Sequence, residues 1–289
     1  MDRSWANYHG HSFYCDGQGN PEEYVLKAID LEMNTIGISS HAPVPFSTDW
    51  NMLSGKLPLY LKELADLKTK YHNQINLLSA LEVDYIPDCA GPQHSRIPNA
   101  LLDYTVGSVH FVDAFHDGTP FSIDDATPKF VKGVDEIFWG DIRKIIKRYF
   151  NLQKEMLEKE PPRILGHPDK IRMHNRNRFF FDETSDWYVE EVRSTLKLAA
   201  EKNVIVEINT KYYDAAEYTF PSSDHFKWMS QNNVPMTLSS DAHKPENLLS
   251  GFTEVAEMLL YHGIEHLWQY DNSTGNFVPK KFDIAGIEW

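Results

Sequence analysis

The sequence contains very little cysteine, with only Cys15 and Cys89 in a chain of 289 residues. Two cysteines cannot form the disulfide framework on which many small secreted domains depend. A chain of this length can instead bury a large apolar core, and its 42% hydrophobic residues are ordinary for a globular protein. We therefore expect a protein that folds without disulfides in a reducing compartment, and the cytoplasm is the simplest expectation.

Long apolar segments and an excess of positive charge are also missing. No run approaches the roughly 20 apolar residues that span a membrane. The opening MDRSWANYHG lacks the apolar centre of a signal peptide. With 28 Lys and Arg against 42 Asp and Glu, the formal net charge is −14, which disfavours nucleic acid as a partner because an acidic surface repels phosphate backbones. We expect no membrane partner, and the composition does not indicate an oligomeric state.

Short β-type apolar runs alternate with helical patterns along the chain. We expect strands in the segments SWANYHGH, TIGISS, INLLSALEV, YTVGSVHFV, RILGH, VIVEINT and PMTLSS. Apolar spacing and terminal signals predict helices over residues 21–33, 57–71, 134–159, 185–202, 221–232 and 245–262. Such alternation indicates parallel β-α units, and seven units favour a closed α/β barrel of TIM type formed by residues 1–289 as one domain. A doubly wound open sheet is the alternative.

Residue types that bind metal ions stand at the C-terminal end of almost every expected strand. In chain order they are His9 and His11, His41, Glu82, His110, His167, Glu207 with Asn209 and Lys211, and finally Asp241 and His243. In a barrel these ends meet at one face, where active sites are built. A single strand-end histidine is more often structural. Six of the 13 histidines occupy such positions, however, and independent accidents explain that pattern poorly.

The spacing and chemistry of these residues favour a multinuclear metal site. Residues two apart in an extended strand point the same way, so His9 and His11 can share one ion, and Asp241 and His243 can reach a common site. Imidazole and carboxylate ligands without thiolate suit zinc, iron(II) or manganese. The set is too large for one ion and divides naturally among two or three. Clustered ions about 3.5–4 Å apart suit phosphoester hydrolysis.

Six segments in this order, HGH, SSHAP, LEVDYIP, GSVHFVD, GHPD and SSDAH, resemble the polymerase-and-histidinol-phosphatase (PHP) superfamily. HAPVPF, LEVDYIPD, GSVHFVD, VEINTK and SSDAHKPENL resemble its histidinol-phosphate phosphatase branch. The resemblance spans about residues 8–248 and implies a distorted (β/α)7 barrel with a trinuclear metal site at the C-terminal strand ends. It assigns His9, His11, Glu82 and Asp241 to the first ion. Glu82 would bridge to a second ion held with His110 and His167, and a third would be bound by Asp16, His41 and His243.

The resemblance also implies an activity, with Glu82, Asp241 and His243 as catalytic residues. The expected reaction is metal-dependent hydrolysis of a small phosphorylated metabolite, L-histidinol phosphate, to L-histidinol and phosphate in histidine biosynthesis. A metal-bridging hydroxide would attack the phosphoryl group in line. Relatives in the superfamily include nucleases and other phosphatases, so a nucleotide, phosphotyrosine or nucleic-acid end is the alternative substrate. A non-catalytic metal-binding module is a further alternative, and the complete ligand set argues against it.

Substrate contacts are expected from residues just beyond the strand ends. Arg172, Arg176 and Lys211 are the candidates for binding phosphate, because guanidinium and ammonium groups pair with it. The alternative for the two arginines is a solvated basic loop. Asp84 and Tyr85 are the candidates for the cationic part of histidinol, which carboxylates and aromatic faces attract.

Overall fold

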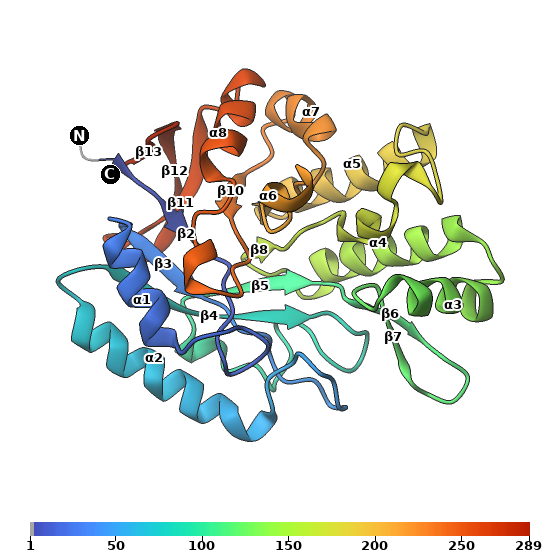
Figure 1. Ribbon diagram of the computed structural model, residues 1–289, viewed down its shortest axis with the longest axis horizontal. Helices are drawn as coiled ribbons and strands as arrows, with labels where there is room; N and C mark the ends of the chain where they lie inside the picture. The colour runs from blue at the N-terminus through green and yellow to red at the C-terminus, as the bar shows by residue number, and fades with distance from the viewer. Residues whose placement is uncertain (1–2) are drawn as a thin grey trace.

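A parallel seven-stranded sheet curls into a nearly closed barrel in the computed structural model, which describes residues 3–289 (Figure 1). Its order is β10-β9-β8-β5-β4-β3-β2, and every neighbouring pair is parallel. The strands are β2 (Ala6–Asn7), β3 (Thr35–Ile38), β4 (Asn76–Asp84), β5 (Tyr104–Ser108), β8 (Ile164–Leu165), β9 (Ile205–Asn209) and β10 (Met236–Ser239). The sequence-based prediction of a TIM-like barrel is thus confirmed, and the open sheet is excluded.

The barrel closes where its first and last strands meet. Beyond the ends of β2 and β10, Gly10 and Ala242 form a parallel bridge. The His11 amide donates to the Ala242 carbonyl at 2.8 Å, and the Ala242 amide donates to the His9 carbonyl at 3.2 Å. This seam brings the first motif, with His9 and His11, next to the last motif, with Asp241 and His243.

The interior of the barrel has an apolar layer and a polar layer. Alternation along each strand turns every second residue inward, and the type of those inward residues changes from apolar to polar toward the C-terminal end. On β4, Leu78 and Ala80 belong to an apolar cluster with Tyr104 and Ile205, and Phe277 from outside the barrel joins it. Nearer the C-terminal ends, the buried side chains are polar instead: Glu82, Asp84, Ser108, His110, Glu207 and Asn209. The inward-facing positions of the strands therefore fill the apolar core first and place polar side chains at the C-terminal end of the barrel.

Helices pack around the barrel. They are α1 (Pro21–Asp30), α2 (Leu57–Tyr71), α3 (Thr127–Phe138), α4 (Ile142–Lys159), α5 (Asp186–Glu201), α6 (Tyr213–Ala216), α7 (Phe226–Gln231) and α8 (Phe252–Tyr261). The start of α1 is a capping box in which the Asn20 side chain accepts from the Glu23 amide and the Glu23 carboxylate accepts from the Asn20 amide. Within residues 3–289, no helix combines the length and apolar character that a membrane crossing requires.

A second, antiparallel sheet covers the N-terminal end of the barrel. Its order is β1 (Arg3–Ser4), β13 (Gly286–Glu288), β12 (Asn276–Asp283) and β11 (His266–Asp271), at the end of the molecule where the C-terminus lies (Figure 1). The Tyr8 hydroxyl joins the two sheets by donating to Gln269 Oε1 at 2.9 Å and accepting from the Tyr270 amide at 2.9 Å. The last ten residues, KKFDIAGIEW, include the end of β12 and all of β13, and their Phe282 and Ile287 side chains pack in the main core cluster of the same chain.

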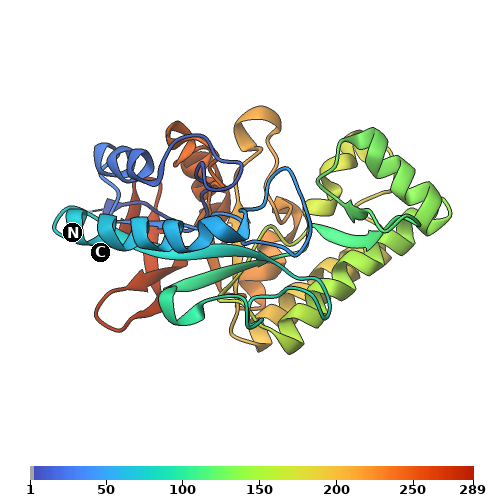
Figure 2. The ribbon, with the colours of Figure 1, turned by 90° about the horizontal axis from the view of Figure 1, so that it is seen from below.

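An insertion between β5 and β8 forms the opposite end of the molecule. It contains the hairpin β6 (Phe111–Ala114) and β7 (Pro120–Ser122), followed by α3 and α4 (Figure 2). The strands β4 and β5 run toward this end, so their C-terminal residues lie between the barrel and the insertion (Figure 2).

Three expected helices differ in the structure. The single helix expected over 134–159 is two helices, because Trp139 and Gly140 both have positive φ, 55° and 74°. The helix expected from residue 221 begins at Phe226 instead, after a short 3-10 turn. Residues 245–262 divide into a 3-10 turn and α8, with Gly251 (φ 69°) before the helix. The strands β11, β12 and β13 were not predicted from the sequence.

Gly37 in β3 lies where a larger residue would meet a buried tyrosine. A Cβ at this position would stand 1.8 Å from the Tyr104 hydroxyl oxygen, and that hydroxyl donates to the Tyr8 carbonyl. We expect Gly37→Ala to lower the free energy of unfolding by about 1–3 kcal/mol through overpacking. Urea unfolding measures this. Gly55→Ala is the matched control, since nothing lies within 4 Å of its added Cβ. Equal midpoints for Gly37→Ala and wild type would contradict the packing.

Candidate metal centre

All nine predicted ligands gather at the C-terminal end of the barrel strands. They come from the loops after β2, β3, β5, β8 and β10 and from β4 itself, and they are His9, His11, Asp16, His41, Glu82, His110, His167, Asp241 and His243. Seven of them are buried, whereas the side chains of Asp16 and His243 are 29% and 22% exposed. The group therefore has a buried floor and one solvent-facing edge. Which ion each side chain binds stays a prediction.

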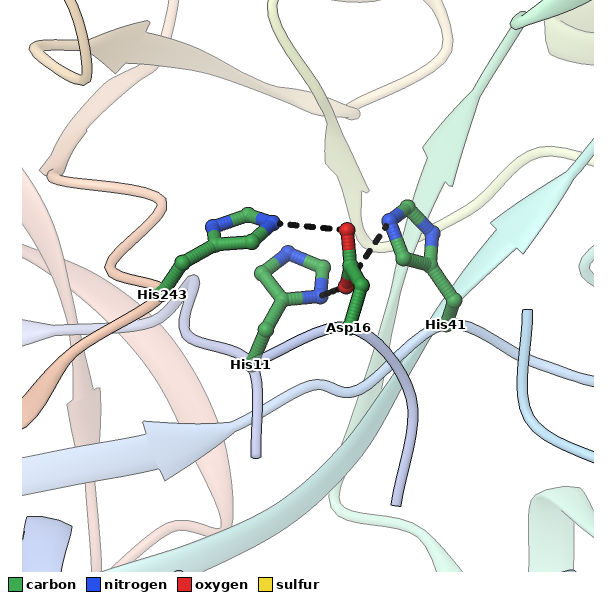
Figure 3. A group of neighbouring side chains, drawn as sticks. All are labelled: His11, Asp16, His41 and His243. Carbon is green, nitrogen blue, oxygen red and sulfur yellow. Dashed lines mark hydrogen bonds and ion pairs between the residues drawn. The ribbon is translucent and has the colours of Figure 1, made fainter. Parts of the chain in front are cut away.

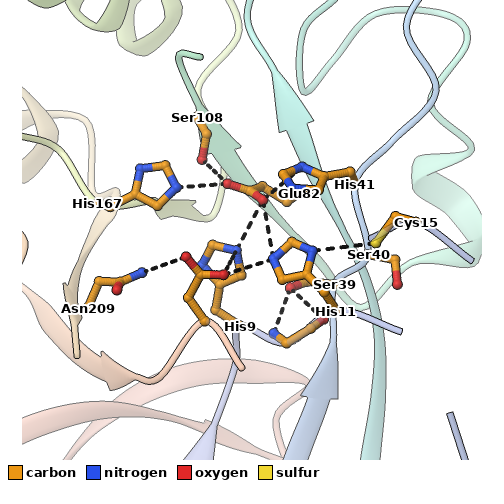
Figure 4. Close-up of polar contacts among 12 residues, drawn as sticks. His9, His11, Cys15, Ser39, Ser40, His41, Glu82, Ser108, His167 and Asn209 are labelled. Atoms are coloured by element: carbon orange, nitrogen blue, oxygen red, sulfur yellow. Dashed lines mark hydrogen bonds and ion pairs between the residues drawn. The ribbon is translucent and has the colours of Figure 1, made fainter. Parts of the chain in front are cut away.

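Glu82 stands at the centre of this group (Figure 4). Its Oε2 lies 3.2 Å from His9 Nε2, 3.4 Å from His11 Nε2 and 3.0 Å from His41 Nδ1. Its Oε1 lies 2.9 Å from His167 Nε2 and 3.6 Å from His110 Nε2, and accepts a hydrogen bond from the Ser108 hydroxyl at 2.6 Å. Burial alone would raise the pKa of Glu82, but the imidazoles around it, led by His41, hold that pKa well below its usual range. The carboxylate thus stays ionised.

The innermost predicted set consists of His9, His11 and Asp241. His11 Nε2 lies 3.0 Å from Asp241 Oδ1, and His9 Nε2 lies 3.8 Å from the same oxygen. His9 Nδ1 donates to Glu207 Oε1 at 2.7 Å, which leaves Nε2 facing the carboxylates. Burial lowers the pKa of His9, but the neighbouring carboxylates, led by Glu207, outweigh burial and raise that pKa well above its usual value. Glu207 therefore orients the His9 ring in the way that carboxylates orient metal-binding histidines.

The outer set joins Asp16, His41 and His243 (Figure 3). Asp16 Oδ2 lies 3.2 Å from His243 Nε2, and Asp16 Oδ1 lies 3.9 Å from His41 Nε2. The His11 ring stacks on His243 with centroids 4.2 Å apart and links this set to the inner one. Lys211 Nζ lies 3.3 Å from Asp241 Oδ2 and 3.3 Å from His243 Nε2. A cation is thereby placed beside the solvent-facing edge, and the expectation that Lys211 binds phosphate stays a prediction.

His110 and His167 complete the group on the side of the insertion. His110 Nδ1 donates to Asp84 Oδ1 at 2.8 Å, and its Nε2 faces Glu82 and Asp124. Burial lowers the pKa of His110, but the charges of Asp84 and Asp124 outweigh it and raise the pKa to about 9. The His167 amide donates to Glu207 Oε2 at 2.8 Å, so Glu207 fixes parts of two ligand loops.

The donor set fits divalent metal ions. Four overlapping groups bring their ligand atoms within 4.8 Å of one another: His11, Asp16, His41 and His243; His9, Glu82 and His167; His9, His11 and Asp241; and His41, Asp84 and His110. Within residues 3–289, five buried imidazole nitrogens of this donor set form no well-aligned hydrogen bond, namely His9 Nε2, His11 Nε2, His41 Nδ1, His110 Nε2 and His167 Nδ1. Carboxylate oxygens lie 3.0–3.6 Å from the first four of these nitrogens. Unpaired buried polar atoms are costly unless a ligand satisfies them. Nitrogen and oxygen donors without thiolate suit zinc, iron or manganese, and the overlap of the groups suits two or three ions.

The expected substrate residues divide into two groups. Lys211 lies beside the metal ligands, and Asp84 lies among them but is committed to His110. Tyr85 points away from the site into the apolar core against α4, where its hydroxyl pairs with Glu155. Successive residues of β4 face opposite sides of the sheet, so Asp84 and Tyr85 cannot both face the site.

The two arginines are not at the metal ligands. Arg172 is buried, and its guanidinium is paired with Asp169, Glu183 and the Thr219 carbonyl, so the expectation that it binds phosphate is corrected by this structural role. Arg176 is exposed on an open cleft in front of α3. A basic residue in a loop can pair with acidic residues close to it in sequence. Arg172 does this here with Asp169 and Glu183.

Five residues of the site were missed or left without a role in the sequence analysis. Glu207 and Asn209 were placed at a strand end, but only the structure shows Glu207 bonded to two ligand loops and to Asn209 Nδ2. Asp124 and Lys170 reach the site from loops, and the sequence carries no signal for them. Ser108 in β5 could have been found, because it shares its face with His110 two residues on.

Comparisons with known proteins agree with this geometry. Residues 7–211 match the PHP domain family. A protein of Schizosaccharomyces pombe named "probable histidinol-phosphatase" is 26% identical over 258 residues, which cover 83% of this chain and 81% of that protein. The family match spans the segments that supply the predicted ligands from His9 to His167.

Two solved structures share the fold. One from Listeria monocytogenes aligns with a TM-score of 0.73 at 23% identity, covering 86% of this chain and 99% of the other. Histidinol phosphate phosphatase from Lactococcus lactis, solved with zinc, L-histidinol and phosphate, aligns with a TM-score of 0.61 at 17% identity and covers 99% of each chain. The barrel architecture is therefore common to all three.

Replacing Glu82 tests the centre of the site. We expect Glu82→Gln to lower the number of tightly bound ions by at least one, because the amide cannot bridge ions as a carboxylate does and a buried ligand is lost. Metal analysis after dialysis measures this. Glu136→Gln on the surface of α3 is the charge-matched control. Unchanged ion stoichiometry in Glu82→Gln would contradict a bridging role.

Metal binding at pH 7 should release protons. His9 and His110 have raised pKa values and carry an extra proton without metal, whereas burial lowers the pKa of His11, His41 and His167, which are neutral. Ions displace only the protons of the first pair, so we expect release of about one to two protons per protein. Calorimetric titrations in two buffers with different ionisation enthalpies measure this number. Equal heats in the two buffers would refute it.

Proposed function

The chain belongs to the PHP domain family, and we propose that it is a metal-dependent phosphomonoesterase that hydrolyses L-histidinol phosphate to L-histidinol and phosphate. The observation that carries the proposal is the group of nine ligand side chains around Glu82 at one barrel end. The named activity of the relative from Schizosaccharomyces pombe and the ligands of the Lactococcus lactis structure support the choice of substrate. The substrate is a small phosphorylated metabolite.

The exposed edge of the ligand group decides how a substrate approaches. Asp16 and His243 are partly exposed, while His9, Glu82 and His167 are almost fully buried. A phosphoryl group therefore enters from the side of Asp16 and His243, next to the Lys211 ammonium. Lys211 is well placed to pair with a phosphoryl oxygen as it arrives.

Each side chain of the group has a distinct task in this proposal. The nine ligands would hold two or three divalent ions, which when bound supply positive charge for the phosphoryl oxygens and lower the pKa of water toward ~7. Glu82 and Asp241 stay ionised because cations and imidazoles hold their pKa values well below the usual range despite burial. They keep the imidazoles fixed, and Glu207 and Asp84 orient the His9 and His110 rings. Catalysis then rests on positioning and charge stabilisation.

The same reasoning extends to the compartment. Cys15 and Cys89 are both free thiols, and neither forms a disulfide within residues 3–289. We propose that the enzyme works in the reducing cytoplasm, where histidine would be made.

A substrate panel tests the proposed activity. Phosphate release would be measured from histidinol phosphate, AMP, a phosphotyrosine peptide and single-stranded DNA, with the protein loaded separately with zinc, manganese or iron. We expect the highest kcat/KM for histidinol phosphate with at least one metal and loss of activity on chelation.

The control is Glu82→Gln prepared in parallel, which reports contaminating phosphatase. A higher kcat/KM for AMP, the peptide or DNA would replace the proposed substrate. Full activity in excess chelator, with no ion bound, would refute the metal-dependent mechanism.

A further inference from the structure

One lysine is buried beside the metal ligands and has no role in the mechanism so far. Among residues 3–289, Lys170 is the only buried lysine, with 4% of its surface exposed. It begins a 3-10 turn, Lys170–His174, three residues after His167. Its ammonium forms an ion pair of 2.8 Å with Asp124 Oδ2. Removing an ammonium from water is unfavourable, so this placement needs a reason.

Asp124 connects the ammonium to the metal ligands. The same oxygen, Asp124 Oδ2, lies 3.7 Å from His110 Nε2, which is one of the nitrogens without a well-aligned hydrogen bond. Asp124 itself lines an open cleft of about 630 Å³ between α3 and the turns at residues 173–180. The Lys170–Asp124 pair therefore lies at the boundary between the metal ligands and the surface of the insertion.

The positive charge of Lys170 reaches the ligand group through Asp124. One oxygen, Asp124 Oδ2, lies 2.8 Å from Lys170 Nζ and 3.7 Å from His110 Nε2. Because a lysine paired with a carboxylate keeps its proton, Lys170 is a permanent cation beside the group of ligands.

We propose that Lys170 binds the phosphoryl group of the substrate from the side opposite Lys211, and that Asp124 holds its ammonium in position. An ammonium has three donors, and Asp124 is the one acceptor recorded for it within residues 3–289, so donors remain for phosphoryl oxygens. Lys211 lies next to His243 and Asp241, whereas Lys170 is paired with Asp124, which in turn lies 3.7 Å from His110. Two cations would then hold the phosphoryl group from both sides.

Arg172 cannot take this part. Its guanidinium is already paired with Asp169, Glu183 and the Thr219 carbonyl and stacks on Tyr218, 4.3 Å from the ring centroid. Lys170, two residues earlier, has an ammonium whose single partner within residues 3–289 is Asp124. The inference rests on the proposed phosphatase function, because it supplies a second anchor for the phosphoryl group.

Inorganic phosphate is the probe for this role. Its affinity for the metal-saturated protein would be measured by calorimetry in wild type, Lys170→Met and Lys129→Met, with metal content checked in each. Lys129 pairs with Asp125 beside the same loop and loses the same charge, but it is exposed and remote from the ligands, so it is the matched control. We expect Lys170→Met to bind phosphate about 10- to 100-fold more weakly, the effect of losing a hydrogen bond to a charged group. Wild-type affinity in Lys170→Met would overturn the proposal.

A double variant separates phosphate binding from simple neutralisation of Asp124. Lys170→Met alone leaves the partly buried Asp124 carboxylate without its cation, which destabilises the fold. Lys170→Met with Asp124→Asn removes both charges, and we expect it to regain thermal stability while phosphate binding stays weak. Recovery of wild-type phosphate affinity in the double variant would show that Lys170 serves only Asp124, and would overturn the proposal.

The test does not depend on turnover. If wild type fails to hydrolyse histidinol phosphate but phosphate affinity still depends on Lys170, the proposed substrate is wrong and the phosphoryl anchor stands. If histidinol phosphate is hydrolysed and phosphate affinity is independent of Lys170, the anchor is wrong and the proposed function stands.

Discussion

The site depends on one buried carboxylate surrounded by imidazoles. Both oxygens of Glu82 face histidine nitrogens within 3.6 Å, on five different histidines. A carboxylate taken out of water is stable only when it is paired, and here the pairs come from loops after four different strands. Each of those loops must therefore be in place before Glu82 is satisfied. The position of this one side chain consequently fixes where the barrel strands must end.

The barrel meets this constraint through simple alternation along its strands. On β4, Leu78 and Ala80 fill the apolar interior, and the next residues on the same face are Glu82 and Asp84. The apolar layer is sealed from below by the second sheet, where Phe277 packs against Tyr8 and Tyr104. Because water is excluded on that side, the electrostatic pairings of the polar layer are strengthened. The core and the site are therefore two levels of one packed interior.

The sequence predicted the parts of the structure that depend on local periodicity and strand position. Residues 57–71 form the expected helix, and all nine predicted ligands lie together, eight of them chosen for their place at or just beyond strand ends and Asp16 through the family resemblance. The break at Trp139 was missed, although Gly140 beside it is a residue typical of helix ends. Asp124 and Lys170 could not be found, because they approach through loops whose course no periodic pattern records. Arg172 was misassigned for the same reason, since its acidic partners become visible only when the loop is folded.

The position of the predicted ions at the seam between β2 and β10 would let them stabilise the fold as well as take part in the chemistry. His9 and His11 follow the first barrel strand and Asp241 follows the last, and an isolated backbone bridge between Gly10 and Ala242 joins the two segments there. An ion held jointly by these side chains would act as a cross-link that closes a loop of nearly the whole barrel. Cross-links across long loops remove much conformational entropy from the open chain. The bound ions would thus stabilise the closed form of the barrel by joining the segments that follow its first and last strands.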